Sequence, residues 1–235
     1  MAGRVAKRAA RRVVTQALVV RSVAYGEADL IVTFLTEAEG KVSAIVRGAR
    51  RGSRRVAGAL EPMHSIAVTY EDKGTELVTL KEAHVVRART GLMTRLEAMD
   101  AAGTALRWAR HMFPPKTPEP AAFATLNDAL DALDAGGDPN EVLAITGLRL
   151  LSDVGWGLEL EQCIVCGTKC PEDASALLDP ARGGIICRKC GGARVLLRAP
   201  VRRAAITHTD VKPHAKALVE LVEAAMAAHT GFGEK

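Results

Sequence analysis

Four cysteines are the residues whose type and spacing most clearly indicate a chemical site in this chain. They form two pairs, each with two intervening residues, and twenty residues separate the pairs: Cys163, Cys166, Cys187 and Cys190. Two residues between thiolates let one tight turn direct both sulfurs at a common tetrahedral metal about 2.3 Å away. Glycines follow each pair and suit such turns. The spacing therefore predicts one zinc ion (Zn2+) held by these four cysteines.

Four thiolates would complete the coordination shell of the metal and leave no position for a catalytic water, so we expect the zinc to be structural. Two other interpretations stay open, namely four reduced core cysteines or a redox-active pair. A redox pair usually stands at the start of a helix, whereas these pairs lie in glycine-rich segments. Cys170 is a fifth cysteine, and we expect it to take no part in the site.

A cluster of arginines is the second candidate site. Five of them fall within nine residues, separated by glycine, alanine and serine: Arg47, Arg50, Arg51, Arg54 and Arg55. The planar donors of a guanidinium group match phosphate oxygens, and small residues between them let several groups follow a polynucleotide backbone. We expect this segment to bind nucleic acid. The alternative is a solvated charged loop without a ligand.

The charge of the chain is concentrated at its beginning. Residues 1–60 hold twelve Lys or Arg against four Asp or Glu, a balance of +8, although the whole chain carries +5. Such asymmetry is typical of a surface that binds a polyanion. The aromatic residues of the first 86 positions are few, namely Tyr25, Phe34 and Tyr70. We therefore expect phosphate contacts, and not base stacking, to supply most of the affinity.

The sequence contains no set of residues with catalytic spacing. It lacks a G-x-x-x-x-G-K-[ST] phosphate loop and an H-E-x-x-H pair, and no serine stands in G-x-S-x-G. Its apolar stretches are too short to span a bilayer, and its basic N-terminus has no signal-peptide cleavage pattern. We expect a cytoplasmic protein that works by binding and is not an enzyme.

Short β-branched runs between turn residues predict five strands, at residues 13–22, 29–36, 41–46, 63–70 and 76–85. Gly40 favours a tight antiparallel hairpin between the second and third strands. Five short antiparallel strands in about eighty residues fit a closed barrel such as the OB-fold. The strand count alone equally allows a sandwich or an SH3-like barrel.

After residue 90 the apolar positions recur every three or four residues, which predicts helices. Pro114 and Pro115 should end the first helix, Gly136 and Gly137 the second, and Asp138 should cap a third that runs to about residue 154. A last helix is expected at about 211–229. The expected domains are an OB-fold at 1–86, a helical domain at 87–154 and 195–235, and a four-cysteine zinc-finger insert at 155–194.

Several motifs in this order resemble the RecO family of bacterial recombination mediators, and the resemblance covers nearly the whole chain. The motifs are Tyr25-Gly-Glu-Ala-Asp29, Gly48-Ala-Arg50-Arg51 continuing through Arg54 to Gly58-Ala-Leu60-Glu61-Pro62, Gly155-Trp156, and Asp179-Pro-Ala-Arg-Gly183-Gly184.

The resemblance implies an OB-fold that binds single- and double-stranded DNA and promotes annealing in DNA repair and recombination by the RecF pathway. It implies three partners: RecR, the C-terminal tail of single-strand-binding protein and, indirectly, the RecA recombinase loaded on covered strands. It also implies a cytoplasmic, nucleoid-associated protein. Carried onto this chain, phosphate binding falls to Arg47, Arg50, Arg51, Arg54 and Arg55, and metal ligation to the four cysteines. A zinc-ribbon transcription or RNA-processing factor is the alternative function that the cysteine pairs and the basic charge also allow.

Overall fold

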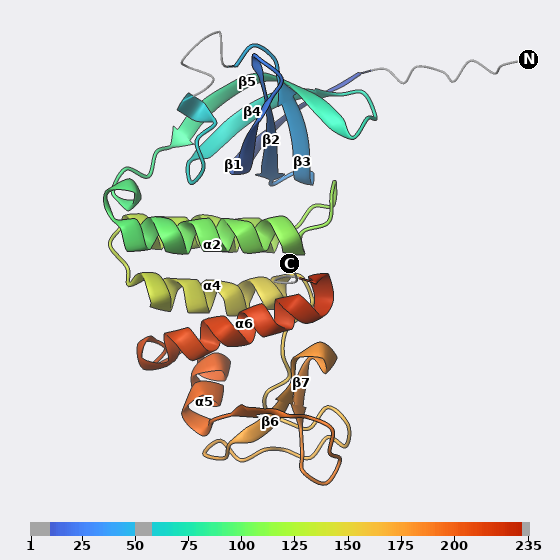
Figure 1. Cartoon of the computed structure of the whole chain (residues 1–235), viewed down its shortest axis with the longest axis vertical. Helices are drawn as coiled ribbons and strands as arrows, with labels where there is room; N and C mark the ends of the chain where they lie inside the picture. The colour runs from blue at the N-terminus through green and yellow to red at the C-terminus, as the bar shows by residue number, and fades with distance from the viewer. Residues whose placement is uncertain (1–9, 50–57, 232–235) are drawn as a thin grey trace, which may run out of the picture. The chain divides into compact units, whose positions relative to one another are not determined.

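The computed structural model of the chain describes residues 10–49 and 58–231 (Figure 1). The described residues form two compact units. The first unit draws on Met1–Arg89 and Phe113–Phe123, and the second on Thr90–Met112 and Ala124–Lys235. The first is built on strands and the second mainly on helices, so the predicted mixed fold class is confirmed. The domain boundaries expected at residues 86, 154 and 194 stay predictions.

Among the described residues of the first unit, five strands close into a barrel: β1 (Arg11–Tyr25), β2 (Asp29–Thr36), β3 (Gly40–Val46), β4 (Ser65–Asp72) and β5 (Leu77–Arg87). Their order around the barrel is β1-β2-β3-β5-β4, and pairing of β1 with β4 closes it. The pairing of β3 with β5 is parallel, whereas antiparallel strands were expected throughout. This closed five-stranded arrangement confirms the predicted OB-fold and argues against a sandwich.

Successive side chains of a strand point to opposite faces of the sheet, so every second residue of each strand points into the barrel. These inward positions hold apolar residues. Val32 and Phe34 of β2 and Val42 and Ala44 of β3 are all buried in one continuous core. A register shift between Val19 and Arg21 interrupts the pairing of β1 with β2. Such irregularities bend a strand, and a strand as long as β1 must bend to pair with both of its neighbours.

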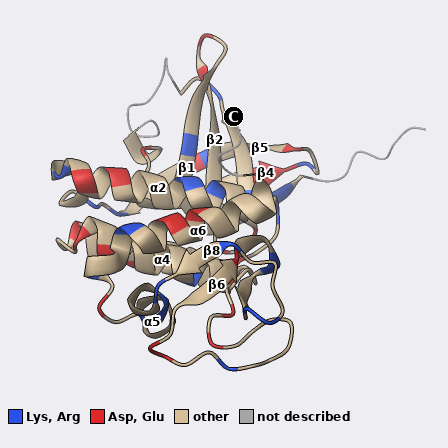
Figure 2. Ribbon diagram, turned by 60° about the horizontal axis from the view of Figure 1, so that its bottom comes forward, with Lys and Arg blue, Asp and Glu red and all other residues tan. Residues whose placement is uncertain are grey.

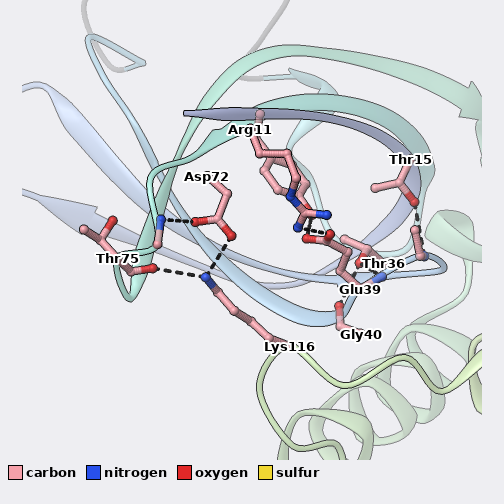
Figure 3. A network of polar contacts seen from close by, with 11 residues as sticks. Arg11, Thr15, Thr36, Glu39, Gly40, Asp72, Thr75 and Lys116 are labelled. Atoms are coloured by element: carbon pink, nitrogen blue, oxygen red, sulfur yellow. Dashed lines mark hydrogen bonds and ion pairs between the residues drawn. The ribbon is translucent and has the colours of Figure 1, made fainter. Parts of the chain in front are cut away.

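Segment 113–123 follows the first helix in sequence but belongs to the barrel unit. The ammonium group of Lys116 donates to Asp72 Oδ2 at 3.0 Å and to the Thr75 carbonyl at 3.2 Å (Figure 3). Its backbone N–H donates to the Lys41 carbonyl at 2.9 Å. Burial alone would raise the pKa of Asp72, but the hydrogen bonds from Lys116 and Gly74 lower it below its usual value. The segment is therefore tied to the start of β3 and to the turn between β4 and β5.

After the barrel strands, the helices of the described residues are α2 (Leu96–Met112), α3 (Pro120–Asp134), α4 (Pro139–Asp153), α5 (Ala199–Thr207) and α6 (Ala215–Thr230), with single 3-10 turns at Leu92–Thr94, Pro180–Arg182 and Lys212–His214. In the second unit α4 lies between α2 and α6 (Figure 1). None of the helices in the described ranges combines the length and the hydrophobicity that a membrane span requires.

The predicted helix signals are confirmed where they are local. Asp138 caps α4 by accepting a hydrogen bond from the Glu141 N–H at 3.1 Å, and Pro139 is the first helical residue. The last helix starts at Ala215 instead of 211, because Pro213 stands in the preceding 3-10 turn. Helix α5 and a three-stranded sheet of β6 (Ala176–Asp179), β7 (Gly184–Ile186) and β8 (Val195–Leu197) were not predicted.

Candidate metal centre and nucleic-acid interface

The structure brings the four predicted cysteine ligands together. Their sulfur atoms all lie within 4.8 Å of one another, and the Sγ atoms of Cys166 and Cys187 are 3.8 Å apart. Four sulfurs at a tetrahedral zinc with bonds of about 2.3 Å are separated by about 3.8 Å, so the cluster has the size of a zinc site. Cys170 is not among the residues of this cluster. A metal ion at this position would have four sulfur ligands, which matches the preference of zinc.

Main-chain hydrogen bonds fold each cysteine pair into a tight turn. In the first pair, the Gly167 N–H donates to the Cys163 carbonyl at 2.8 Å; in the second, the Gly191 N–H donates to the Cys187 carbonyl at 3.0 Å. Both glycines have a positive φ, +70° and +67°, as the sequence analysis expected of these turns. The Ile164 N–H donates to the Ile185 carbonyl at 3.0 Å, which joins the first turn to β7 next to the second pair.

The surroundings of the four sulfurs change the pKa values of the cysteines in different directions. The backbone N–H of Cys187 donates to Cys163 Sγ at 3.3 Å and, with further N–H groups of the turn, lowers the pKa of the Cys163 thiol to about 6. The neighbouring side chains of Cys187 and Cys166 raise the pKa of Cys190 to about 12. Sulfurs this close cannot all ionise without a cation among them. A divalent metal would supply that charge and favour the thiolate at every position.

A residue that sequence analysis missed supports the first cysteine pair. Arg202 of α5 is 1% exposed, and its guanidinium donates to three backbone carbonyls. The acceptors are Leu160 at 2.6 Å, Ala174 at 3.2 Å and Pro171. These carbonyls lie on both sides of Cys163 and Cys166 in the sequence, so Arg202 fixes the two ends of the loop that carries this pair. No sequence signal distinguishes Arg202 from its exposed neighbour Arg203.

One of the five predicted phosphate-binding arginines lies within the described residues. Arg47 directly follows β3 and is exposed, whereas Arg50, Arg51, Arg54 and Arg55 lie outside the described residues. The turn after Arg47 is anchored by the Gly48 N–H, which donates to Asp29 Oδ1 at 2.8 Å. Asp29 ends the Tyr25-Gly-Glu-Ala-Asp29 motif, so the structure places this motif next to the start of the arginine segment.

Both signs of charge occur on the barrel strands (Figure 2). Several basic residues at the start of β1 and on β5 are paired with carboxylates. Arg11 pairs with Glu39, Arg12 with Glu82 at 3.9 Å, and Lys81 with Glu71 at 3.1 Å. Glu39 also accepts a hydrogen bond from the Tyr70 hydroxyl at 2.8 Å. Burial, together with this carboxylate, raises the pKa of Tyr70 above its usual value. Tyr70 is fully buried and unable to stack on a base.

Two family models match the chain. The model described as "Recombination protein O N terminal" matches residues 11–89, and the one described as "Recombination protein O C terminal" matches residues 93–204. The chain belongs to the RecO family. The first match covers the strands of the barrel, and the second covers α2 to α4 and both cysteine pairs. Membership assigns the chain to DNA repair and recombination, in a family of mediators that is not a known enzyme family.

Individual RecO relatives show the same similarity. The chain is 36% identical over 177 residues to the DNA repair protein RecO of Anaeromyxobacter sp. strain Fw109-5. The aligned residues make up 75% of this chain and 69% of the relative. It is 34% identical over 178 residues to the DNA repair protein RecO of Rubrobacter xylanophilus, and the aligned residues make up 75% of this chain and 70% of that relative. The DNA repair protein RecO of Myxococcus xanthus is 35% identical to this chain over 187 residues, which make up 79% of this chain and 75% of that relative.

Proposed function

We propose that this chain is a recombination mediator that binds single- and double-stranded DNA through the arginine segment of its barrel. The observation that carries the proposal is an OB-fold barrel, in a chain of the RecO family, whose third strand leads directly into five closely spaced arginines. Contacts to phosphates would give binding that is independent of sequence and sensitive to salt. By holding two complementary strands on the same surface, the chain would promote their annealing.

The proposed role needs partners and no catalytic step. We propose that the chain binds RecR and the C-terminal tail of single-strand-binding protein, and that it thereby helps RecA load on covered strands. The support is family membership, and the site of action would be the nucleoid in the cytoplasm. The zinc would stabilise the cysteine-rich segment without taking part in chemistry. The match to both RecO models leaves the transcription or RNA-processing alternative without an observation that favours it.

The test removes two of the arginines. The logarithm of the affinity for single-stranded DNA falls linearly with the logarithm of the salt concentration, and each phosphate contact contributes roughly −0.7 to the slope. Five contacts therefore predict a slope of about −3.5. The double variant R50A/R51A should reduce the slope to about −2.1 and weaken binding at low salt. Fluorescence anisotropy with a labelled oligonucleotide at rising salt measures both quantities.

Arg12→Ala is the matched control, because Arg12 is also an exposed arginine of the barrel unit but is paired with Glu82. It should change the slope much less than the double variant does. A wild-type affinity that does not respond to salt would contradict phosphate-driven binding. Cleavage of labelled DNA in the presence of Mg²⁺ would contradict the proposal that the chain acts by binding alone.

A further inference from the structure

Strands β2 and β3 present a second face that is separate from the barrel core. Val32, Phe34 and Ala44 point into the core and are fully buried. The residues that alternate with them, such as Ile31 and Ile45, are half-buried and point to the opposite side. The barrel therefore has an outer face over these two strands that is apolar in its middle and partly exposed.

The last part of β1 extends this outer face by one strand. Residues that pair directly across neighbouring strands point to the same side of a sheet. After the register shift, alternate residues of β1 pair with the outer positions of β2, and these continue onto β3. The pairs are Arg21 with Thr33, Val23 with Ile31 and Tyr25 with Asp29, followed by Ile31 with Ile45 and Thr33 with Ser43.

Arg47 joins the same face at its far edge. Val46 is the last paired residue of β3, opposite Leu30, and Arg47 follows it as the exposed first residue of the turn. Asp29 is the carboxylate in this row, and it accepts the Gly48 N–H at 2.8 Å. The row thus runs from Tyr25 through Asp29 to Arg47, and four more arginines follow within eight residues of the sequence.

Two arginines of this face differ from three basic residues on other strands of the barrel. Within the described ranges, Arg21 and Arg47 are exposed and neither forms an ion pair, whereas Arg11, Arg12 and Lys81 are each paired with a glutamate. Two unpaired guanidinium groups outweigh the one carboxylate of Asp29, and they lie at separate places on the face. Such an arrangement favours an extended polyanion over a compact anion.

Tyr25 is the exposed aromatic residue of this face. Its side chain is 53% exposed, which is unusual for an aromatic ring in a strand. Arg21 lies about 13 Å before it along β1, and Arg47 directly follows β3, the second strand from β1 in the barrel order. An aromatic ring near two cations can stack on a base while the cations contact phosphates of neighbouring nucleotides.

We propose that the outer face of β1, β2 and β3 binds single-stranded DNA, with Tyr25 stacking on a base and with Arg21 and Arg47 contacting phosphates. This inference rests on the proposed DNA-binding function and adds to it a base contact, which a site built on arginines alone would lack. Base pairs in a duplex are stacked on each other, so the Tyr25 contact would distinguish single-stranded from double-stranded DNA.

The test compares two labelled oligonucleotides of equal length, one of thymidine nucleotides and one with an abasic backbone, by anisotropy at fixed salt. Tyr25→Ala should weaken binding to the thymidine strand about fivefold or more and leave the abasic strand within about twofold. Tyr25→Phe keeps the ring and should bind as the wild type does. Arg47→Ala should weaken binding to both strands. Val14→Ala, at an exposed position of β1 before the register shift, is the matched control and should change neither.

The outcomes separate this inference from the function on which it rests. If the wild type binds neither oligonucleotide, the proposed DNA-binding function fails. If the wild type binds both and Tyr25→Ala binds the thymidine strand unchanged, only the stacking role is overturned. An equal loss on both strands would also overturn stacking, because a base contact cannot affect a strand without bases. Circular dichroism melts of each variant check that the barrel is folded.

Discussion

Arg202 shows how a single buried side chain can determine the shape of a metal-binding segment. A guanidinium group is costly to bury unless its donors are satisfied. Here the acceptors are carbonyls from both ends of the loop that carries Cys163 and Cys166. The contact holds the ends of that loop against α5 without help from the metal. The cysteine pair is therefore partly preorganised, which would lower the entropy cost of binding a metal ion.

We predict that Arg202→Ala destabilises the chain by about 3 kcal/mol, because three backbone carbonyls, one buried and two partly buried, would lose their donor. The variant should also release zinc to a chelator faster than the wild type does. Thermal denaturation and a colorimetric zinc-release assay measure the two effects. Arg203→Ala is the control, since Arg203 is the exposed neighbour in the same helix. Identical melting temperatures for the two variants would show that the Arg202 contacts contribute nothing to stability.

At the scale of elements, the turn between β2 and β3 has a role beyond closing a hairpin. Gly40 has a φ of +66°, and a Cβ atom at this position would lie 1.7 Å from the carbonyl oxygen of Thr117. Segment 113–123 thus approaches the turn more closely than any side chain would allow. Together with the Lys116 contacts to Asp72 and Thr75, this approach attaches the segment to the barrel.

A comparison of Gly40→Ala with Gly26→Ala measures the effect of the close approach between Gly40 and the backbone of Thr117. Both glycines have a positive φ, but no atom lies within 4 Å of a Cβ placed on Gly26. Gly26→Ala should cost about 1 kcal/mol of unfolding free energy, from backbone strain alone. Gly40→Ala should cost on the order of 3 kcal/mol or more, because the backbone of Thr117 must also move. Urea denaturation of both variants gives the difference, and equal costs would contradict tight docking of the segment.

The elements that the sequence predicts well are those encoded by neighbouring residues. The cysteine turns, the Gly40 hairpin and the Asp138 cap each depend on a few adjacent positions, and the structure contains all three. Strands β6 to β8 are only three or four residues long, too short for a period of two to be recognised. The docking of segment 113–123 and the burial of Arg202 depend on partners distant in sequence, which no local pattern can show.

At the scale of the whole chain, the two candidate sites belong to different units. The barrel unit has its own apolar core and contains the Tyr25 face and Arg47, whereas the four cysteines lie in the second unit. The charge divides in a similar way, because residues 1–60 carry +8 and the remaining residues carry −3. Metal binding and phosphate binding should therefore be separable by experiment.

Removal of the proposed zinc provides that separation. Structural zinc would contribute its binding free energy to folding, and sulfurs within 4.8 Å of one another cannot all remain thiolates once the metal leaves. A chelator or Cys187→Ser should lower the melting temperature of the second unit and leave the affinity for single-stranded DNA within about twofold. Cys170→Ser, a control outside the cluster, should keep one zinc per chain.

Superimposable melts with and without chelator would contradict a structural metal. A parallel loss of DNA affinity would mean that the second unit contributes to the DNA interface, because the charges and the exposed ring of the barrel would be unchanged.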